Sequence, residues 1–206
     1  MSNSNLVSYT KLSPNCSERT KPITKITIHH MATVNGSLES IGNWFSQSKA
    51  QASSNYGIDS KGNIALYVPE EYRAWTSSNS ENDNQAITIE VANCKGEPNW
   101  EVSQEAYEAL IKLCVDICKR NNIKELNYTG DKTGNLTRHN MFANTKCPGP
   151  YLQARFSDIA IKVNKELTNK PQTIYRVQVG AFSKKENAEK MVEKLKGLGI
   201  SAIIKE

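Results

Sequence analysis

Two short runs in which apolar and polar residues alternate constrain the fold more than any other feature of this chain. The first is ITIHH at residues 26–30, where we expect a strand over residues 23–29, and the second is ITIEVAN at residues 87–93, where we expect a strand over residues 84–93. Side chains of a strand point alternately to its two faces, so each run predicts a strand with an apolar core face. The isoleucines would lie on that face, and His29 and Glu90 on the opposite, open face. If both strands belong to one sheet, His29 and Glu90 project from the same surface.

Helical patterns alternate with these and other strand patterns. Residues 54–68 read as two strands around a Ser-Lys-Gly-Asn turn, and residues 37–47 carry apolar residues at helical spacing, including Trp44. The pattern of residues 102–121 predicts a long helix. A last helix follows, and its apolar side carries Phe156, Ile159, Val163 and Leu167. This alternation predicts an α/β fold with a central mixed β-sheet flanked by helices.

The composition changes after residue 168. We expect a catalytic domain over residues 1–168, a polar linker over 169–173 and a small module over 174–206. Residues 174–182 and 200–204 read as strands around a helix, which makes one βαβ unit. So short a unit is too small to bury a core alone, and should pack on the main domain or pair with a second copy.

Charge and targeting features narrow the classes of partner. The net charge of +5 suits an anionic surface such as a bacterial wall, or nucleic acid. Lysine and arginine form no dense cluster, so we predict no nucleic-acid partner. No apolar run is long enough for membrane insertion. The first fifteen residues lack a basic start and an apolar run, so we expect synthesis in a cytoplasm without a signal peptide.

Histidine and cysteine side chains suggest a metal site. The five cysteines show no disulfide spacing, and Cys114 and Cys118 sit one helical turn apart in an apolar pattern. His139 and Cys147 lie in a late loop, and with His29 they would form a zinc set with one position open for water. A histidine and a cysteine eight residues apart also occur by chance, so spacing alone leaves the metal site open.

Five motifs, in this order, resemble the N-acetylmuramoyl-L-alanine amidases of the bacteriophage lysozyme and peptidoglycan recognition protein type: KITIHHMA, SSNYGIDSKGNI, RAWTSS, ITIEVAN and RHNMFANTKCPGP. The resemblance implies hydrolysis of the amide between N-acetylmuramic acid and L-alanine, in an endolysin or autolysin. It implies Zn²⁺ as cofactor, with the ligands His29, His139 and Cys147. It also implies Glu90 as general base, Tyr56 as a group that positions the water or stabilises the oxyanion, and Thr145 as a hydrogen-bond donor to the tetrahedral intermediate.

The C-terminal module resembles one half of the sporulation-related (SPOR) domain, which binds peptidoglycan glycan strands. The full domain has two such halves, so the resemblance implies a homodimer in which two chains pair their modules. Gln178 and Phe182 are the residues we expect to contact glycan, and Trp75 of RAWTSS would line the substrate groove or lie in the core.

Two other functions compete with a zinc amidase. A recognition module would hold peptidoglycan without cleaving it. Non-catalytic members of the resembled family lack the cysteine ligand, whereas this chain has Cys147. A thiol peptidase would use Cys147 as nucleophile, but Pro148 follows it directly, where a nucleophile would normally begin a helix. The amidase reading predicts action on the cell wall after release from the cytoplasm.

Overall fold

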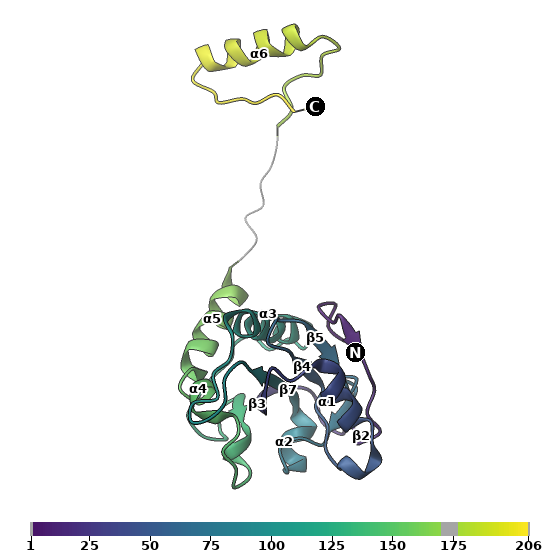
Figure 1. The fold of residues 1–206 in the computed structure, drawn as a ribbon. Coiled ribbons are helices and arrows are strands. Elements are labelled where there is room, and N and C mark those ends of the chain that lie inside the picture. Colours follow the sequence, from purple (N-terminus) through teal and green to yellow (C-terminus); the bar gives the residue numbers. More distant parts are fainter. Residues whose placement is uncertain (1, 170–176, 206) are drawn as a thin grey trace. The chain divides into compact units, whose positions relative to one another are not determined.

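The computed structural model describes residues 2–169 and 177–205, which belong to two compact units, Met1–Asn169 and Lys170–Glu206 (Figure 1). Apart from Asn169, the predicted linker falls outside the described residues. Among the described residues, no helix has the length and apolar character needed to cross a membrane.

A mixed six-stranded sheet forms the centre of the larger unit, as predicted, in the order β1-β5-β4-β7-β3-β8. Strand β3 is parallel to both of its neighbours, β7 and β8, and β4 and β5 form the predicted antiparallel pair. A second, two-stranded sheet pairs β2 with β6. The strands are β1 Tyr9–Thr10, β2 Cys16–Glu18, β3 Lys25–Val34, β4 Tyr56–Ile58, β5 Ile64–Leu66, β6 Tyr72–Ala74, β7 Ala86–Asn93 and β8 Leu136–Arg138.

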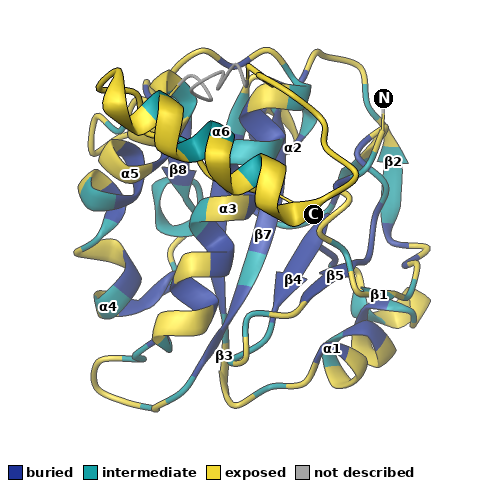
Figure 2. Cartoon of the chain, turned by 90° about the horizontal axis from the view of Figure 1, so that it is seen from above, coloured by how far each residue is buried: buried dark blue, intermediate teal, exposed yellow. Residues whose placement is uncertain are grey.

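One face of the sheet packs against two long helices, α3 (Gln104–Arg120) and α5 (Phe156–Thr168). Ser103 caps the N-terminus of helix α3: its side-chain oxygen accepts a hydrogen bond from the Ala106 N–H at 3.2 Å. Figure 2 shows the strands buried and the outer sides of these helices exposed. The core joins the strand isoleucines to the apolar stripes of both helices: Ile26, Ile28, Ile87, Ile89, Leu110, Leu113, Cys114, Ile117, Phe156, Ile159 and Val163.

The opposite face is not open, and this part of the prediction is wrong. Thr27 and Thr88 are fully buried there because α1 (Leu38–Phe45), α2 (Ser80–Gln85) and nearby loops cover the sheet. Asn82 of α2 donates a hydrogen bond to the Thr27 hydroxyl at 2.9 Å. Helix α1 contributes Leu38 and Phe45 to a small cluster around Tyr67, while Trp44 lies outside this cluster and is 49% exposed.

The smaller unit contains the predicted helix, α6 (Lys185–Gly197), but differs in its strands. Part of the first predicted strand, residues 174–176, lies outside the described residues. Residues 177–182 and 200–204 form no strand, since the described part of this unit offers them no hydrogen-bonded neighbour. Along α6 the predicted inward residues are only half-buried: Ala188, Met191, Val192 and Leu195.

Candidate metal centre

The register of the parallel strands brings two histidines side by side. Thr27 of β3 pairs with Thr137 of β8, and their hydroxyls lie 2.9 Å apart. His29 and His139 each follow two residues later, so they leave the same sheet face at its carboxyl edge. Their ring centroids are 4.6 Å apart. His139 begins the short helix η2 (His139–Met141), directly after β8.

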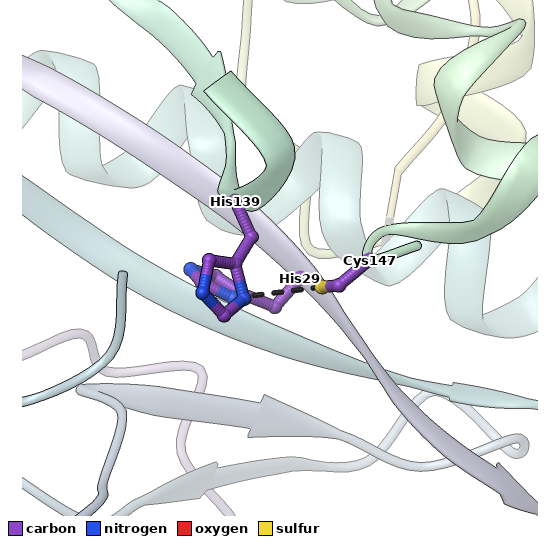
Figure 3. Close-up of side chains that lie close together, drawn as sticks. All are labelled: His29, His139 and Cys147. Atoms are coloured by element: carbon purple, nitrogen blue, oxygen red, sulfur yellow. Dashed lines mark hydrogen bonds between the residues drawn. The ribbon is translucent and has the colours of Figure 1, made fainter. Parts of the chain in front are cut away.

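Cys147 reaches the histidines from the loop between η2 and α4 (Gly149–Gln153) (Figure 3). Its Sγ lies 3.6 Å from His29 Nδ1 and accepts a hydrogen bond from the His30 N–H at 3.4 Å. The loop approaches the strand closely at Gly149, which has φ +82°; a Cβ there would lie 3.1 Å from the His30 ring. Glycine at this position therefore lets the loop place the thiol beside His29.

The three side chains suit a zinc ion. One ligand atom from each of His29, His139 and Cys147 lies within 4.8 Å of the others. Tetrahedral zinc with ordinary bond lengths separates its sulfur and nitrogen ligands by about 3.5 Å, close to the 3.6 Å between Cys147 Sγ and His29 Nδ1. His29 Nε2 and His139 Nε2 are buried without a hydrogen-bond partner among the described residues. The distance between Cys147 Sγ and His29 Nδ1 therefore suits zinc, and each histidine also has a ring nitrogen without a hydrogen bond among the described residues.

Glu90 is the acidic neighbour of this set. It is the register partner of His29, and its Oε1 lies 3.9 Å from His29 Nδ1. Its Oε2 is buried with no partner among the described residues. Burial raises the pKa of Glu90 to about 8. The carboxylate is thus a stronger base than an exposed glutamate and lies beside the candidate ligands.

Burial also sets the protonation of the candidate ligands. It lowers the pKa of His29 well below its usual value, and nearby His139 and His30 act in the same direction. Burial raises the pKa of the Cys147 thiol, while a bound cation would favour the thiolate. At neutral pH the His29 imidazole is therefore neutral, which is the form that binds a metal.

Tyr56, predicted to stabilise the oxyanion, is not at this site, and that prediction is wrong. The register places Gly57 opposite Glu90, so strand alternation turns Tyr56 to the other sheet face. There its hydroxyl donates to Glu70 Oε1 at 2.6 Å and accepts from the Ser4 N–H at 2.9 Å. Tyr56 is a buried structural residue that holds the N-terminal segment.

Four other residues were predicted to contact substrate or the reaction intermediate: Thr145, Trp75, Gln178 and Phe182. The Thr145 hydroxyl accepts a hydrogen bond from the Cys147 N–H at 3.2 Å, within the loop that carries the thiol. Trp75 lines a cleft, and its Nε1 donates to Ser17 Oγ at 2.8 Å. In the smaller unit Gln178 is exposed and Phe182 is 42% exposed. Their roles remain predictions.

A layer of buried hydroxyl groups lies next to the candidate ligands and was not predicted from the sequence. Thr27 and Thr137 bond to each other, and Thr76 and Thr88 pair at 2.8 Å between their hydroxyls. Thr27 precedes His29, and Thr88 precedes Glu90, by two residues on the same strand face. Threonines at these positions of the alternating runs could have predicted the layer. They were not interpreted in this way because the face that carries them was expected to be open.

Two family models match the chain, one in each of its two units. Residues 19–150 match the family model described as N-acetylmuramoyl-L-alanine amidase, and residues 171–206 match the SPOR domain. None of the curated proteins matches the chain.

Solved structures share the fold of the larger unit. The amidase LysC from Clostridium intestinale is 24% identical, with a TM-score of 0.55 over 77% of this chain and 95% of its own. The endolysin amidase LysCS from the same organism is 20% identical, with a TM-score of 0.55 over 77% and 97%. The Drosophila peptidoglycan recognition protein SA is 18% identical, with a TM-score of 0.57 over 72% and 90%.

Proposed function

Since this chain belongs to the N-acetylmuramoyl-L-alanine amidase family, we propose that it cleaves the amide between N-acetylmuramic acid and L-alanine with a zinc-activated water. The proposed ligands are His29, His139 and Cys147. One observation carries the proposal: their ligand atoms converge within 4.8 Å beside Glu90. Three protein ligands leave one position for water, as in catalytic rather than structural zinc sites.

Glu90 is the proposed general base. When bound, zinc would lower the pKa of a coordinated water to about 7 and polarise the substrate carbonyl. Glu90 takes a proton from the attacking water and returns it to the leaving amine. Its unpartnered, buried Oε2 leaves a lone pair available for that transfer. Burial raises the pKa of this carboxyl, and a bound cation nearby would favour its ionised form, which is the form that accepts a proton.

Thr145 and Trp75 have supporting roles in this proposal. The Thr145 hydroxyl uses its oxygen to accept from the Cys147 N–H, so its own proton is available to the developing oxyanion. Trp75 is half-buried in the lining of a cleft, where its ring can pack against substrate. Both roles depend on the substrate lying across the carboxyl edge of β3 and β7.

The test is release of new alanine amino termini from purified Gram-positive cell walls. We expect release by the full chain, loss of release with phenanthroline, and recovery on adding zinc. Wall binding without new termini would instead make the protein a recognition module. Cleavage that resists the chelator would exclude the zinc mechanism and return attention to Cys147 as a nucleophile. That route needs a thiolate beside an imidazolium, and burial disfavours both charges.

For the smaller unit we propose binding to the glycan of peptidoglycan, with Gln178 and Phe182 as contacts. The match of this unit to the SPOR domain supports the ligand. Together the two units would make an endolysin or autolysin that is held on its substrate. Pull-down with purified walls, comparing wild type with Phe182→Ala, tests the contact. Equal binding by both proteins would exclude Phe182 from it.

We also propose that two copies of the chain pair through this unit. None of its described residues is buried, and several of its large apolar side chains are exposed: Val177, Val179, Phe182, Leu198, Ile200, Ile203 and Ile204. A second copy offers the same apolar surface, and it carries the same two segments that the sequence predicts as strands. Sedimentation equilibrium of the full chain should show a dimer at micromolar concentration, and a monomer there would contradict the proposal.

A further inference from the structure

The loop between β7 and α3 packs against the segment that carries Cys147. Its backbone meets α4, where the Tyr151 N–H donates a hydrogen bond to the Asn99 carbonyl at 3.1 Å. Its Trp100 side chain meets the same segment, because a Cβ at Gly149 would lie 3.1 Å from Trp100 Cβ. Gly149 is only two residues from Cys147. The two loops therefore touch next to the thiol that the proposed function assigns to zinc.

Trp100 also contacts the histidine that follows His29 in the chain. Its ring meets the His30 ring edge to face, with the centroids 5.4 Å apart and the planes at 86°. The His30 N–H donates to Cys147 Sγ at 3.4 Å. A Cβ at Gly149 would lie 3.1 Å from the His30 ring as well. Three segments that are far apart in sequence therefore meet beside the thiol, and Trp100 contacts the other two.

The backbone of Trp100 is strained. Its φ is +53°, a value that is rare for a residue with a bulky side chain. Two hydrogen bonds hold this conformation: Asn93 Nδ2 donates to the Trp100 carbonyl at 2.7 Å, and the Trp100 N–H donates to the Gly96 carbonyl at 2.9 Å. Such backbone strain is typical of functional sites. Glycine would adopt this φ without strain, which indicates that the tryptophan ring itself is needed here.

The packing of Trp100 does not explain the ring as part of the core. Trp100 is half-buried, and neither of the two apolar clusters among the described residues includes it. The contacts that the ring and Cβ make are instead with the polar His30 ring and with Gly149. Its position is therefore better explained by what it does to these neighbours than by the burial of apolar surface.

We infer that Trp100 is a positioning residue for the candidate zinc site. Its contacts with His30 and Gly149 hold the loop that carries Cys147. This inference rests on the proposed function. Cys147 Sγ lies 3.6 Å from His29 Nδ1, which is close to the separation of two zinc ligands, so a small movement of the loop would separate the pair. Groups that orient the ligands of a metal from outside the ligand set typically change its affinity by about 10–100-fold.

The first test needs no metal and follows the alkylation of cysteines by iodoacetamide in the zinc-free full chain. Peptide mapping separates the five cysteines. Trp100→Ala should raise the rate at Cys147 several-fold, because the loop loses its support. The rate at Cys114 should stay unchanged, because Cys114 is fully buried in the core of the larger unit. Equal rises at both cysteines would indicate a general loss of folding and overturn the inference.

The second test measures zinc affinity by competition with a chromophoric chelator. Trp100→Ala should weaken zinc binding by roughly ten-fold to a hundred-fold. With cobalt in place of zinc, the same variant should show a weaker charge-transfer band from thiolate to metal. Trp100→Phe keeps a ring that can pack on His30 and should restore most of the affinity. Trp44→Ala is the matched control, since Trp44 lies on α1 outside this contact and is 49% exposed.

Trp100→Gly separates the ring from the backbone conformation. Glycine removes the ring but accepts a φ of +53°, so this variant should lose as much zinc affinity as Trp100→Ala. Wild-type affinity in both variants would overturn the inference. Wild-type affinity in Trp100→Gly alone would assign the effect to backbone strain and would also overturn it. Failure of the wild type to bind zinc would instead refute the proposed function.

Discussion

The two faces of the central sheet are both covered, yet they differ in chemistry. On one face Ile28 and Ile89 are fully buried against helices α3 and α5. On the other face Thr27 is fully buried, His29 is 1% exposed, and the Glu90 side chain is 16% exposed. Each strand thus alternates between an apolar core and a polar interior with a period of two.

This difference shows that burial alone does not identify the residues that stabilise a fold. Buried polar groups are tolerated when they are hydrogen-bonded, as Thr27 is to Thr137 and Asn82. Three of the side chains that carry an unpartnered buried atom among the described residues lie at the metal centre: His29, His139 and Glu90. We therefore expect substitutions on the apolar face to change stability, and substitutions at the metal centre to change chemistry.

The largest effect is expected from Cys147→Ser. The loss of the thiol should abolish tight zinc binding and reduce amide hydrolysis to background, because a serine hydroxyl is a poor zinc ligand. Competition with a chromophoric chelator measures zinc affinity, and release of alanine amino termini measures activity. Cys94→Ser is the matched control, since Cys94 is half-buried outside the candidate site. Wild-type zinc affinity in Cys147→Ser would remove Cys147 from the ligand set.

Glu90→Gln should have the next largest effect. The amide keeps the size of the side chain but cannot accept the water proton, so kcat should fall by roughly 10²–10⁴-fold. Zinc affinity and KM should change little, because Glu90 is not a proposed ligand. Steady-state kinetics on soluble muropeptides separate the two parameters. A rise in KM with normal kcat would show that Glu90 binds substrate instead.

On the apolar face, Leu113→Ala should destabilise the fold without changing the chemistry. Leu113 is fully buried in α3, and such truncations cost about 2–5 kcal/mol. Guanidinium unfolding of the zinc-loaded protein measures the loss, with the exposed neighbour substitution Lys112→Ala as control. The kcat of the folded variant should equal that of the wild type. A large loss of kcat would show that the two faces are not independent.

Tyr56→Phe gives the smallest expected effect and the sharpest distinction between the faces. It removes a hydrogen bond to Glu70 and leaves the Ser4 N–H without its acceptor, at a cost of about 1–3 kcal/mol in stability. The kcat should be unchanged, because Tyr56 lies on the apolar face. A fall in kcat at unchanged stability would contradict this placement and restore its predicted role at the oxyanion.

Local pattern was sufficient for the two long strands and the long helix of the larger unit. The alternation in residues 26–30 and 87–93 predicted β3 and β7, and the helical spacing in residues 102–121 predicted α3. The same kind of spacing predicted α6 in the smaller unit. Yet Leu113 of α3 is fully buried, while Leu195 of α6 is only half-buried. A pattern specifies the apolar side of a helix but not the partner that covers it.

Sequence by itself determined which residues alternate, where the long helices form, and that His29 and Glu90 each lie opposite the isoleucines of their own strand, because these depend on neighbours in the chain. Only the tertiary structure decided that this face is covered, that Cys147 lies 3.6 Å from His29, and that Tyr56 faces away. Those outcomes depend on strand register and loop paths between segments far apart in sequence. One residue of register reverses the face of every side chain in a strand, and the partner strand that fixes the register lies far away in the sequence.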